Sequence, residues 1–239
     1  MFGFSFHGFV GLKVLQITSA EPQDGKTTVA ANMALAMAHA GKKVLLIDAD
    51  LRCPKVHQIF RLRHEIGLSD VISGEIQFEN AIQTCEIPGL SLLTAGMTPS
   101  NPAELLGGME IENLLRQLRS EYDYVIVDTP PLMAVSDPAI MASRVDGLVL
   151  VVRAGKNKLT TIRDGCELLQ TMGVTLLGAV VNDVAVTDAQ KYGDAYQEGS
   201  AATSRGTIVS EPVQVMTPAL VSVPRMPASS TRHAEETVN

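Results

Sequence analysis

The sequence contains no tryptophan, and aromatic residues make up only 4% of its 239 residues. Four of the six phenylalanines lie among the first nine residues, at Phe2, Phe4, Phe6 and Phe9. This aromatic segment, residues 1–10, is expected either to pack on the core as a strand or arm or to dock on a membrane-bound partner. It lacks the basic region and cleavage site of a secretory signal peptide. No apolar run approaches the ~18 residues of a membrane span, so any membrane contact is expected to come through a partner.

Cysteine and basic charge are also scarce. The three cysteines, Cys53, Cys85 and Cys166, are far apart and have neither CxxC nor Cys/His spacing. They therefore predict reduced thiols rather than a disulfide framework or a zinc site. The net charge is −7, and no run of lysine or arginine offers a binding surface for nucleic acid. We expect a cytoplasmic protein with no nucleic-acid partner, recruited to the inner face of the cell membrane, if at all, by another protein.

What the sequence does contain is a regular alternation of short apolar runs and longer helical segments. The runs are rich in β-branched residues and lie at 13–18, 43–48, 90–94, 124–128, 147–153 and 176–182. This alternation predicts an α/β fold in which a doubly wound, mostly parallel sheet is flanked by helices. Two of the helical segments stop at glycines, Gly41 and Gly173, which commonly terminate helices.

The composition also predicts a domain plan. From about Gly199 the chain is rich in Ser, Thr, Ala and Pro without an apolar period, which is typical of disorder. We therefore expect the aromatic segment at 1–10, one nucleotide-binding domain at 11–198, and a disordered tail at 199–239.

A phosphate-binding motif follows the first expected strand. Residues 20–27, AEPQDGKT, stand between that strand and a helix, which is the context of a Walker A loop. Backbone N–H groups of such a loop and the helix N-terminus cradle phosphate. Lys26 is expected to reach the β- and γ-phosphates of ATP, and the Thr27 hydroxyl to hold Mg²⁺. Asp24, Gly25 and Thr28 complete the expected nucleotide-binding set.

Two features of this motif bear on its identity as a P-loop. Ala20 replaces the usual first glycine, which is tolerable if its φ is negative. A dinucleotide-binding fold also places an acidic residue at the end of the second strand, but the chain has no GxGxxG turn. The sequence therefore favours a P-loop.

Carboxylates follow two other expected strands. Asp128 ends residues 124–128 and is a Walker B aspartate by position, although it could simply cap the turn before Pro130. Asp48 and Asp50 end the second strand and are expected on the same side of an extended chain. Acids that face one phosphate site suggest a division of labour, with one near the metal and another available as a base.

With these motifs the sequence resembles the bacterial tyrosine kinases, the P-loop autokinases that regulate capsule and exopolysaccharide export. The matching residues are Thr18-Ser19, Pro22, Gly25-Lys26-Thr27, Asp48-x-Asp50-x-Arg52, Pro54, residues 101–106, Asp128-Thr129-Pro130-Pro131, Asp146-Gly147 and Asn182-Asp183-Val184. The resemblance extends from about Lys13 to Val184, and the Asp-x-Asp-x-Arg motif beside a P-loop is its specific part.

The resemblance implies transfer of the ATP γ-phosphoryl group to tyrosine, with ATP and Mg²⁺ bound. It makes Asp48 the base or the organiser of the transition state, and Asp50 and Asp128 ligands of the metal together with Thr27. Arg52 would orient groups or stabilise charge, and Asn182 would lie near the adenine. The implied partner is a membrane polysaccharide co-polymerase or transmembrane activator, and the kinase could form homo-oligomers.

The sequence departs from the family in two places. The family ends in a tyrosine cluster, whereas Tyr192 and Tyr196 are the only candidate acceptors here, and they could equally cover one face of a helix. The family's ring-building Glu-x-x-Arg-x-x-Arg helix has no match, because Glu112, Arg116 and Arg119 have a different spacing. We expect these three residues to belong to an ordinary amphipathic helix.

Two alternative functions therefore accompany the kinase hypothesis. One is a nucleotide-switched assembly factor that binds a membrane protein without tyrosine transfer. The other is a partition or cell-division ATPase, which shares the fold but carries a lysine where Glu21 stands. A carboxylate cannot supply that positive charge, so the last alternative is disfavoured.

Overall fold

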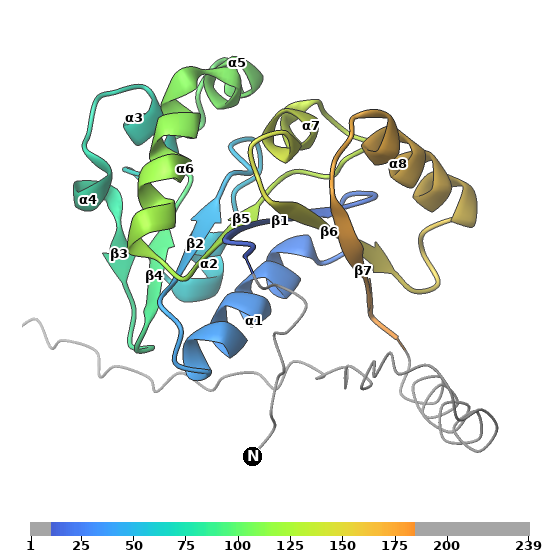
Figure 1. Cartoon of the computed structure of the whole chain (residues 1–239), viewed down its shortest axis with the longest axis horizontal. Coiled ribbons are helices and arrows are strands. Elements are labelled where there is room, and N and C mark those ends of the chain that lie inside the picture. Colours follow the sequence, from blue (N-terminus) through green and yellow to red (C-terminus); the bar gives the residue numbers. More distant parts are fainter. Residues whose placement is uncertain (1–10, 185–239) are drawn as a thin grey trace, which may run out of the picture. The chain divides into compact units, whose positions relative to one another are not determined.

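The computed structural model describes residues 11–184 (Figure 1). The aromatic segment, the predicted tail, the boundary at residue 198, and Tyr192 and Tyr196 lie outside the described residues and stay predictions. The described elements, in chain order, are β1 (Val14–Ser19), α1 (Lys26–His39), β2 (Val44–Asp48), α2 (Val56–Phe60), α3 (Leu68–Ile72), α4 (Phe78–Ala81), β3 (Gln83–Thr84), β4 (Leu90–Leu93), α5 (Pro102–Gly107), α6 (Met109–Glu121), β5 (Tyr124–Asp128), α7 (Asp137–Ala142), β6 (Gly147–Arg153), α8 (Leu159–Thr171) and β7 (Leu176–Asn182).

One sheet organises this part of the chain. Its strand order is β3-β4-β2-β5-β1-β6-β7, and all pairs are parallel except β3 with β4. The mostly parallel, doubly wound α/β class is therefore confirmed. Within the described residues, no helix is long and apolar enough to cross a membrane.

Helices cover both faces of the sheet, as Figure 1 shows with α1 on one face and α6, α7 and α8 on the other. Alternate residues of each strand explain the two layers: Leu15 and Ile17 of β1 pack in the cluster that contains the α1 alanines, while Val14 packs in the cluster under α6. The small side chains of α1, among them Ala30 and Ala34, let this helix lie close to the sheet.

The predicted helix ends are close to those observed. Helix α1 ends at His39, and Gly41 takes a left-handed φ of 80° while its N–H donates to the Ala38 carbonyl. Helix α8 ends at Thr171, and Gly173 has a φ of 68° in the same role. These glycines stop the helices and direct the chain back toward the sheet.

The register of the strands brings the motifs to one edge of the sheet. Asp48 at the end of β2 pairs with Asp128 at the end of β5, and Asp128 pairs in turn with Ile17 of β1. Because the phosphate motif directly follows β1, the carboxyl ends of these three strands bring it together with both aspartates. Ligands of open parallel sheets bind at this edge.

Candidate active site

The P-loop joins β1 to α1 with the shape that phosphate binding requires. Gly25 occupies the position before the first helical residue with a φ of 92°, which glycine adopts most readily. A Cβ at this position would also overlap Nδ2 of Asn182. Ala20 is buried and does not take a positive φ, so the condition for replacing the usual first glycine is met.

Among the described residues, Lys26 is the only cation that contacts Asp50 and Asp128. Its Nζ lies 2.8 Å from Asp50 Oδ2 and 3.6 Å from Asp128 Oδ2, and it donates to Thr27 Oγ1 at 3.2 Å. Burial lowers the pKa of Lys26, but the charges of Asp128 and Asp50 outweigh it and raise the pKa above the usual value. Lys26 therefore stays protonated and neutralises part of the acidic cluster.

Asp128 is fully buried, and neither of its oxygens accepts a well-aligned hydrogen bond from a described residue, although the Thr27 hydroxyl lies close enough to act on its pKa. Burial raises its pKa to about 7, and the neighbouring Asp48 charge acts in the same direction. Magnesium prefers oxygen ligands and is usually bound by one or two carboxylates. The free oxygens of Asp128, beside Asp50 and the Thr27 hydroxyl, therefore fit the predicted metal.

Asp48 is buried too, but its oxygens are occupied. Oδ2 accepts the backbone N–H groups of Lys55 and Val56 at 2.9 Å each, and Oδ1 accepts that of Asp50 at 3.2 Å. Burial is the largest influence on the pKa of Asp48 and raises it to about 6. The hydrogen bonds from the Val56 and Lys55 N–H groups act in the opposite direction. Asp48 thus fixes the chain that follows β2.

Asp48 and Asp50 reach the site together. Strand β2 ends at Asp48, and contact with β5 continues for one more residue, because the Ala49 N–H donates to the Asp128 carbonyl at 2.8 Å. The Asp50 N–H donates to Asp48 Oδ1, while the Asp50 carboxylate contacts Lys26 and accepts the Cys53 N–H. This side-chain-to-backbone contact holds both acids at the site, and their expected placement on the same side of an extended chain stays a prediction.

Arg52 turns toward α7. Its Nε and Nη2 donate to the two carboxylate oxygens of Asp137, at 2.8 and 2.9 Å, and the Asp137 side chain is fully buried. Asp137 was not predicted from the sequence. The Asp-Pro pair at residues 137–138 signals a helix start, but nothing local reveals its partner 85 residues away. The charge-stabilising role of Arg52 stays a prediction.

Asn182 lies at the P-loop, because its Nδ2 donates to the Asp24 carbonyl at 2.9 Å. Its predicted place near the adenine stays a prediction. Three residues that were not predicted from the sequence also contact the loop: Arg153, the last residue of β6, and Lys156 and Asn157 in the turn that follows. Their only sequence signal is their position at or just after the end of the apolar run of β6, at the same edge of the sheet.

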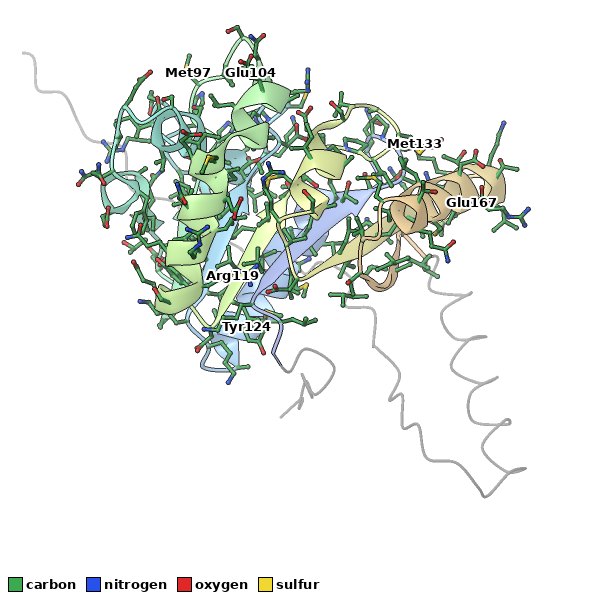
Figure 2. The ribbon with its side chains drawn as sticks, turned by 45° about the horizontal axis from the view of Figure 1, so that its top comes forward. Met97, Glu104, Arg119, Tyr124, Met133 and Glu167 are labelled. Atoms are coloured by element: carbon green, nitrogen blue, oxygen red, sulfur yellow. The ribbon has the colours of Figure 1, made fainter. Side chains whose placement is uncertain are left out.

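The arginines of α6 form structural ion pairs at the other edge of the sheet. Arg119 pairs with Asp146 at 2.6 Å, and Arg116 pairs with Glu112 one helical turn away. Figure 2 labels Arg119 on α6 and Tyr124, which begins β5, whereas the site lies where β5 ends. The amphipathic-helix interpretation of these residues agrees with this placement.

Comparisons with known proteins agree with this arrangement. A family model described as an AAA domain matches residues 13–173. Tyrosine-protein kinase YwqD of Bacillus subtilis (strain 168) is 43% identical over 182 residues, which are 76% of this chain and 77% of that protein. The solved kinase domain of VpsO is 35% identical with a TM-score of 0.72, covering 75% of this chain and 88% of that one. The septum site-determining protein MinD of Pyrococcus horikoshii OT3, complexed with Mg-ADP, has a TM-score of 0.61 at 24% identity over 75% of this chain and 76% of that one, which supports the fold alone.

Proposed function

The chain belongs to the family of bacterial tyrosine-protein kinases, and we propose that it transfers the γ-phosphoryl group of ATP to tyrosine, its own tyrosines included. The predicted family, P-loop fold and kinase class are confirmed by these relatives. The observation that carries the proposal is the cluster of Lys26, Asp50 and Asp128, buried together beside an anion-binding loop.

The residues divide into phosphate-binding and acidic groups. Phosphoryl transfer depends mainly on positioning and on stabilising charge. The N–H groups at the start of α1 and the Lys26 ammonium would bind the phosphates. Lys26 then exchanges its contacts with Asp50 and Asp128 for contacts with phosphate oxygens.

Asp50, Asp128 and Thr27 would hold Mg²⁺. When bound, this ion would neutralise negative charge that develops during transfer. Its binding would also replace the charge that Lys26 withdraws from the carboxylates. The acid cluster therefore has a countercharge both before and after nucleotide binds.

Asp48 is proposed as the organiser of this site rather than as its base. Both of its oxygens already accept backbone N–H groups, so it maintains the turn that aims Asp50 at Lys26. The tyrosine oxygen bonds to the γ-phosphorus as the bond between that phosphorus and the ADP oxygen breaks, ADP leaves, and the hydroxyl proton passes to solvent water. The position of Asp50 governs how well the phosphates are aligned.

Asp48→Asn tests this role. We expect ATP binding to stay within about threefold of wild type and phosphoryl transfer to fall by about 100-fold or more. Calorimetric titration with ATP and a radiolabel transfer assay measure the two quantities. Asp123→Asn, an exposed carboxylate just before β5 at the opposite edge of the sheet, is the matched control. Equal losses of ATP binding and phosphoryl transfer would indicate that Asp48 is a metal ligand instead.

We also propose a cytoplasmic kinase that acts with a membrane polysaccharide co-polymerase or transmembrane activator in capsule or exopolysaccharide export. Family membership supports this proposal. Addition of the partner's cytoplasmic segment should raise tyrosine phosphorylation, and an unchanged rate over a saturating range would argue against the partnership. Analytical ultracentrifugation with and without nucleotide would reveal the expected homo-oligomers.

A further inference from the structure

The P-loop is held from outside by side chains of other segments. Three consecutive carbonyl oxygens of the loop each accept a side-chain donor. The Pro22 carbonyl accepts Lys156 Nζ, the Gln23 carbonyl accepts Arg153 Nη1 at 3.2 Å, and the Asp24 carbonyl accepts Asn182 Nδ2 at 2.9 Å. These donors come from the end of β6, the turn after it and the end of β7.

The carbonyl contacts determine where the loop N–H groups point. A peptide unit is planar and trans, so the C=O of one residue and the N–H of the next point in opposite directions. Anchoring the carbonyls of residues 22–24 therefore turns the N–H groups of Gln23, Asp24 and Gly25 the other way. Within residues 11–184 these three N–H groups have no backbone or side-chain acceptor. Free, aligned N–H groups of this kind form an anion cradle.

The loop needs this restraint because its backbone is strained. The strained residue is Gln23, whose φ of 65° is uncommon for a residue other than glycine. Strained conformations of this kind persist only where surrounding contacts determine them. Lys156 donates to the Pro22 carbonyl and Arg153 to the Gln23 carbonyl, which are the carbonyls on either side of the Gln23 N–H and Cα.

Lys156 has a second task at the Asp24 carboxylate. The Asp24 side chain is fully buried and lies 2.7 Å from Lys156 Nζ. It also accepts the Glu21 N–H at 2.8 Å and Nδ2 of Asn157 at 3.1 and 3.2 Å. A buried carboxylate is costly unless it is paired and hydrogen-bonded. Lys156 is the only cation in contact with it among the described residues, and the same ammonium lies 3.8 Å from the Glu21 carboxylate.

We propose that Lys156 is a positioning residue for polyphosphate binding. By pairing with Asp24 and holding the Pro22 carbonyl, it keeps the N–H groups of residues 23–25 aimed into the phosphate site. Lys156 acts through the loop and touches no phosphate itself. The inference rests on the proposed function only in that the site binds the phosphates of a nucleotide; it does not require tyrosine as the acceptor.

The test is the dissociation constant of ADP, measured by calorimetry on the full chain. Lys156→Met should weaken ADP binding by about tenfold or more, because a misaligned cradle loses charge-assisted hydrogen bonds to phosphate. Lys156→Arg should restore most of the affinity, since a guanidinium can pair with Asp24. Lys158→Met is the matched control: this exposed lysine precedes α8, and its side chain makes no hydrogen bond or ion pair with the described residues.

A double variant shows whether Lys156 acts through Asp24. Once Asp24→Asn has removed the buried charge, the further change Lys156→Met should weaken ADP binding by a smaller factor than it does in the wild type. Unchanged ADP affinity in Lys156→Met would overturn the proposal. So would equal losses in both backgrounds, or failure of Lys156→Arg to restore binding in a protein whose melting curve is normal.

The failures of the two proposals are distinguishable. A wild-type chain that binds ADP but never forms phosphotyrosine would contradict the kinase function and leave the role of Lys156 in place. If Lys156→Met binds ADP normally while the wild type forms phosphotyrosine, the positioning role alone is wrong.

Discussion

At the scale of the residue, the site is defined by an excess of buried negative charge. Asp48, Asp50 and Asp128 lie together with Lys26 as their one contacting cation among the described residues. Burial raises the pKa of Asp48 to about 6 and that of Asp128 to about 7. In the absence of ligand the cluster therefore binds protons close to neutral pH, and a metal ion would displace them.

These raised pKa values predict a pH dependence of stability. The Asp128 carboxyl group has a pKa of about 7 in the folded protein and of 3.8 as a model compound. Its preference for the proton in the folded state therefore stabilises the fold, and this contribution is complete below about pH 4. That contribution is lost as the pH rises through about 7. Asp128→Asn removes the ionisation, so the nucleotide-free variant should be more stable relative to wild type at pH 8 than at pH 5.5.

Urea denaturation of wild type and Asp128→Asn at the two pH values measures this effect. We expect the difference in unfolding free energy to move in favour of the variant by at least about 1 kcal/mol between pH 5.5 and pH 8. A difference that is the same at both pH values would show that Asp128 ionises normally in the folded protein.

At the scale of the element, the site depends on the turns that follow the strands. The pair of Arg52 with Asp137 joins the turn after β2 to the start of α7. Arg52→Ala would leave a fully buried carboxylate without its cation, although the arginine side chain itself is 40% exposed and screened by solvent.

We expect Arg52→Ala to lower the free energy of unfolding by about 1 kcal/mol. Arg116→Ala is the control, because it removes an exposed pair with Glu112 on the surface of α6 and should change stability by less than about 0.5 kcal/mol. Chemical denaturation of both variants, and of Arg52→Ala combined with Asp137→Asn, measures the coupling. Additive effects in the double variant would show that the pair contributes nothing to stability.

The elements that the sequence predicted are those with a clear apolar pattern. Strands 124–128, 147–153 and 176–182 are observed at the predicted bounds. The first two are buried parallel strands, which are continuous apolar runs, and the third has the same apolar pattern although most of its residues are exposed among the described residues. The short helices α2, α3 and α4 were not predicted, because four or five residues hold too little periodicity to identify a helix.

The candidate site was predictable to the same extent. Local motifs identified Lys26, Asp48 and Asp128, whose positions follow from a strand end or a loop signature. The partners Asp137 and Lys156 were not identified, since each meets its counterpart across more than 80 residues of sequence. Contacts of this kind depend on the three-dimensional arrangement of turns, which no local pattern encodes.

At the scale of the whole molecule, sheet order explains why separate motifs form one site. Strand β1 lies between β5 and β6, so the P-loop is adjacent both to Asp128 and to the segment after β6 that holds Lys156. One neighbouring strand supplies an acid to the phosphate side of the loop, and the other supplies the residues that anchor its carbonyls. The candidate acceptors Tyr192 and Tyr196 follow β7 in sequence, outside the described residues.

The central claim is transfer of phosphate from ATP to tyrosine, and mass spectrometry of the purified chain after incubation with Mg-ATP tests it most directly. We predict phosphotyrosine at Tyr192 or Tyr196 in the wild type. Lys26→Met should abolish it, because the ammonium group proposed to bind the phosphates is gone. No phosphotyrosine in the wild type, even with the cytoplasmic segment of the proposed membrane co-polymerase present, would contradict the account.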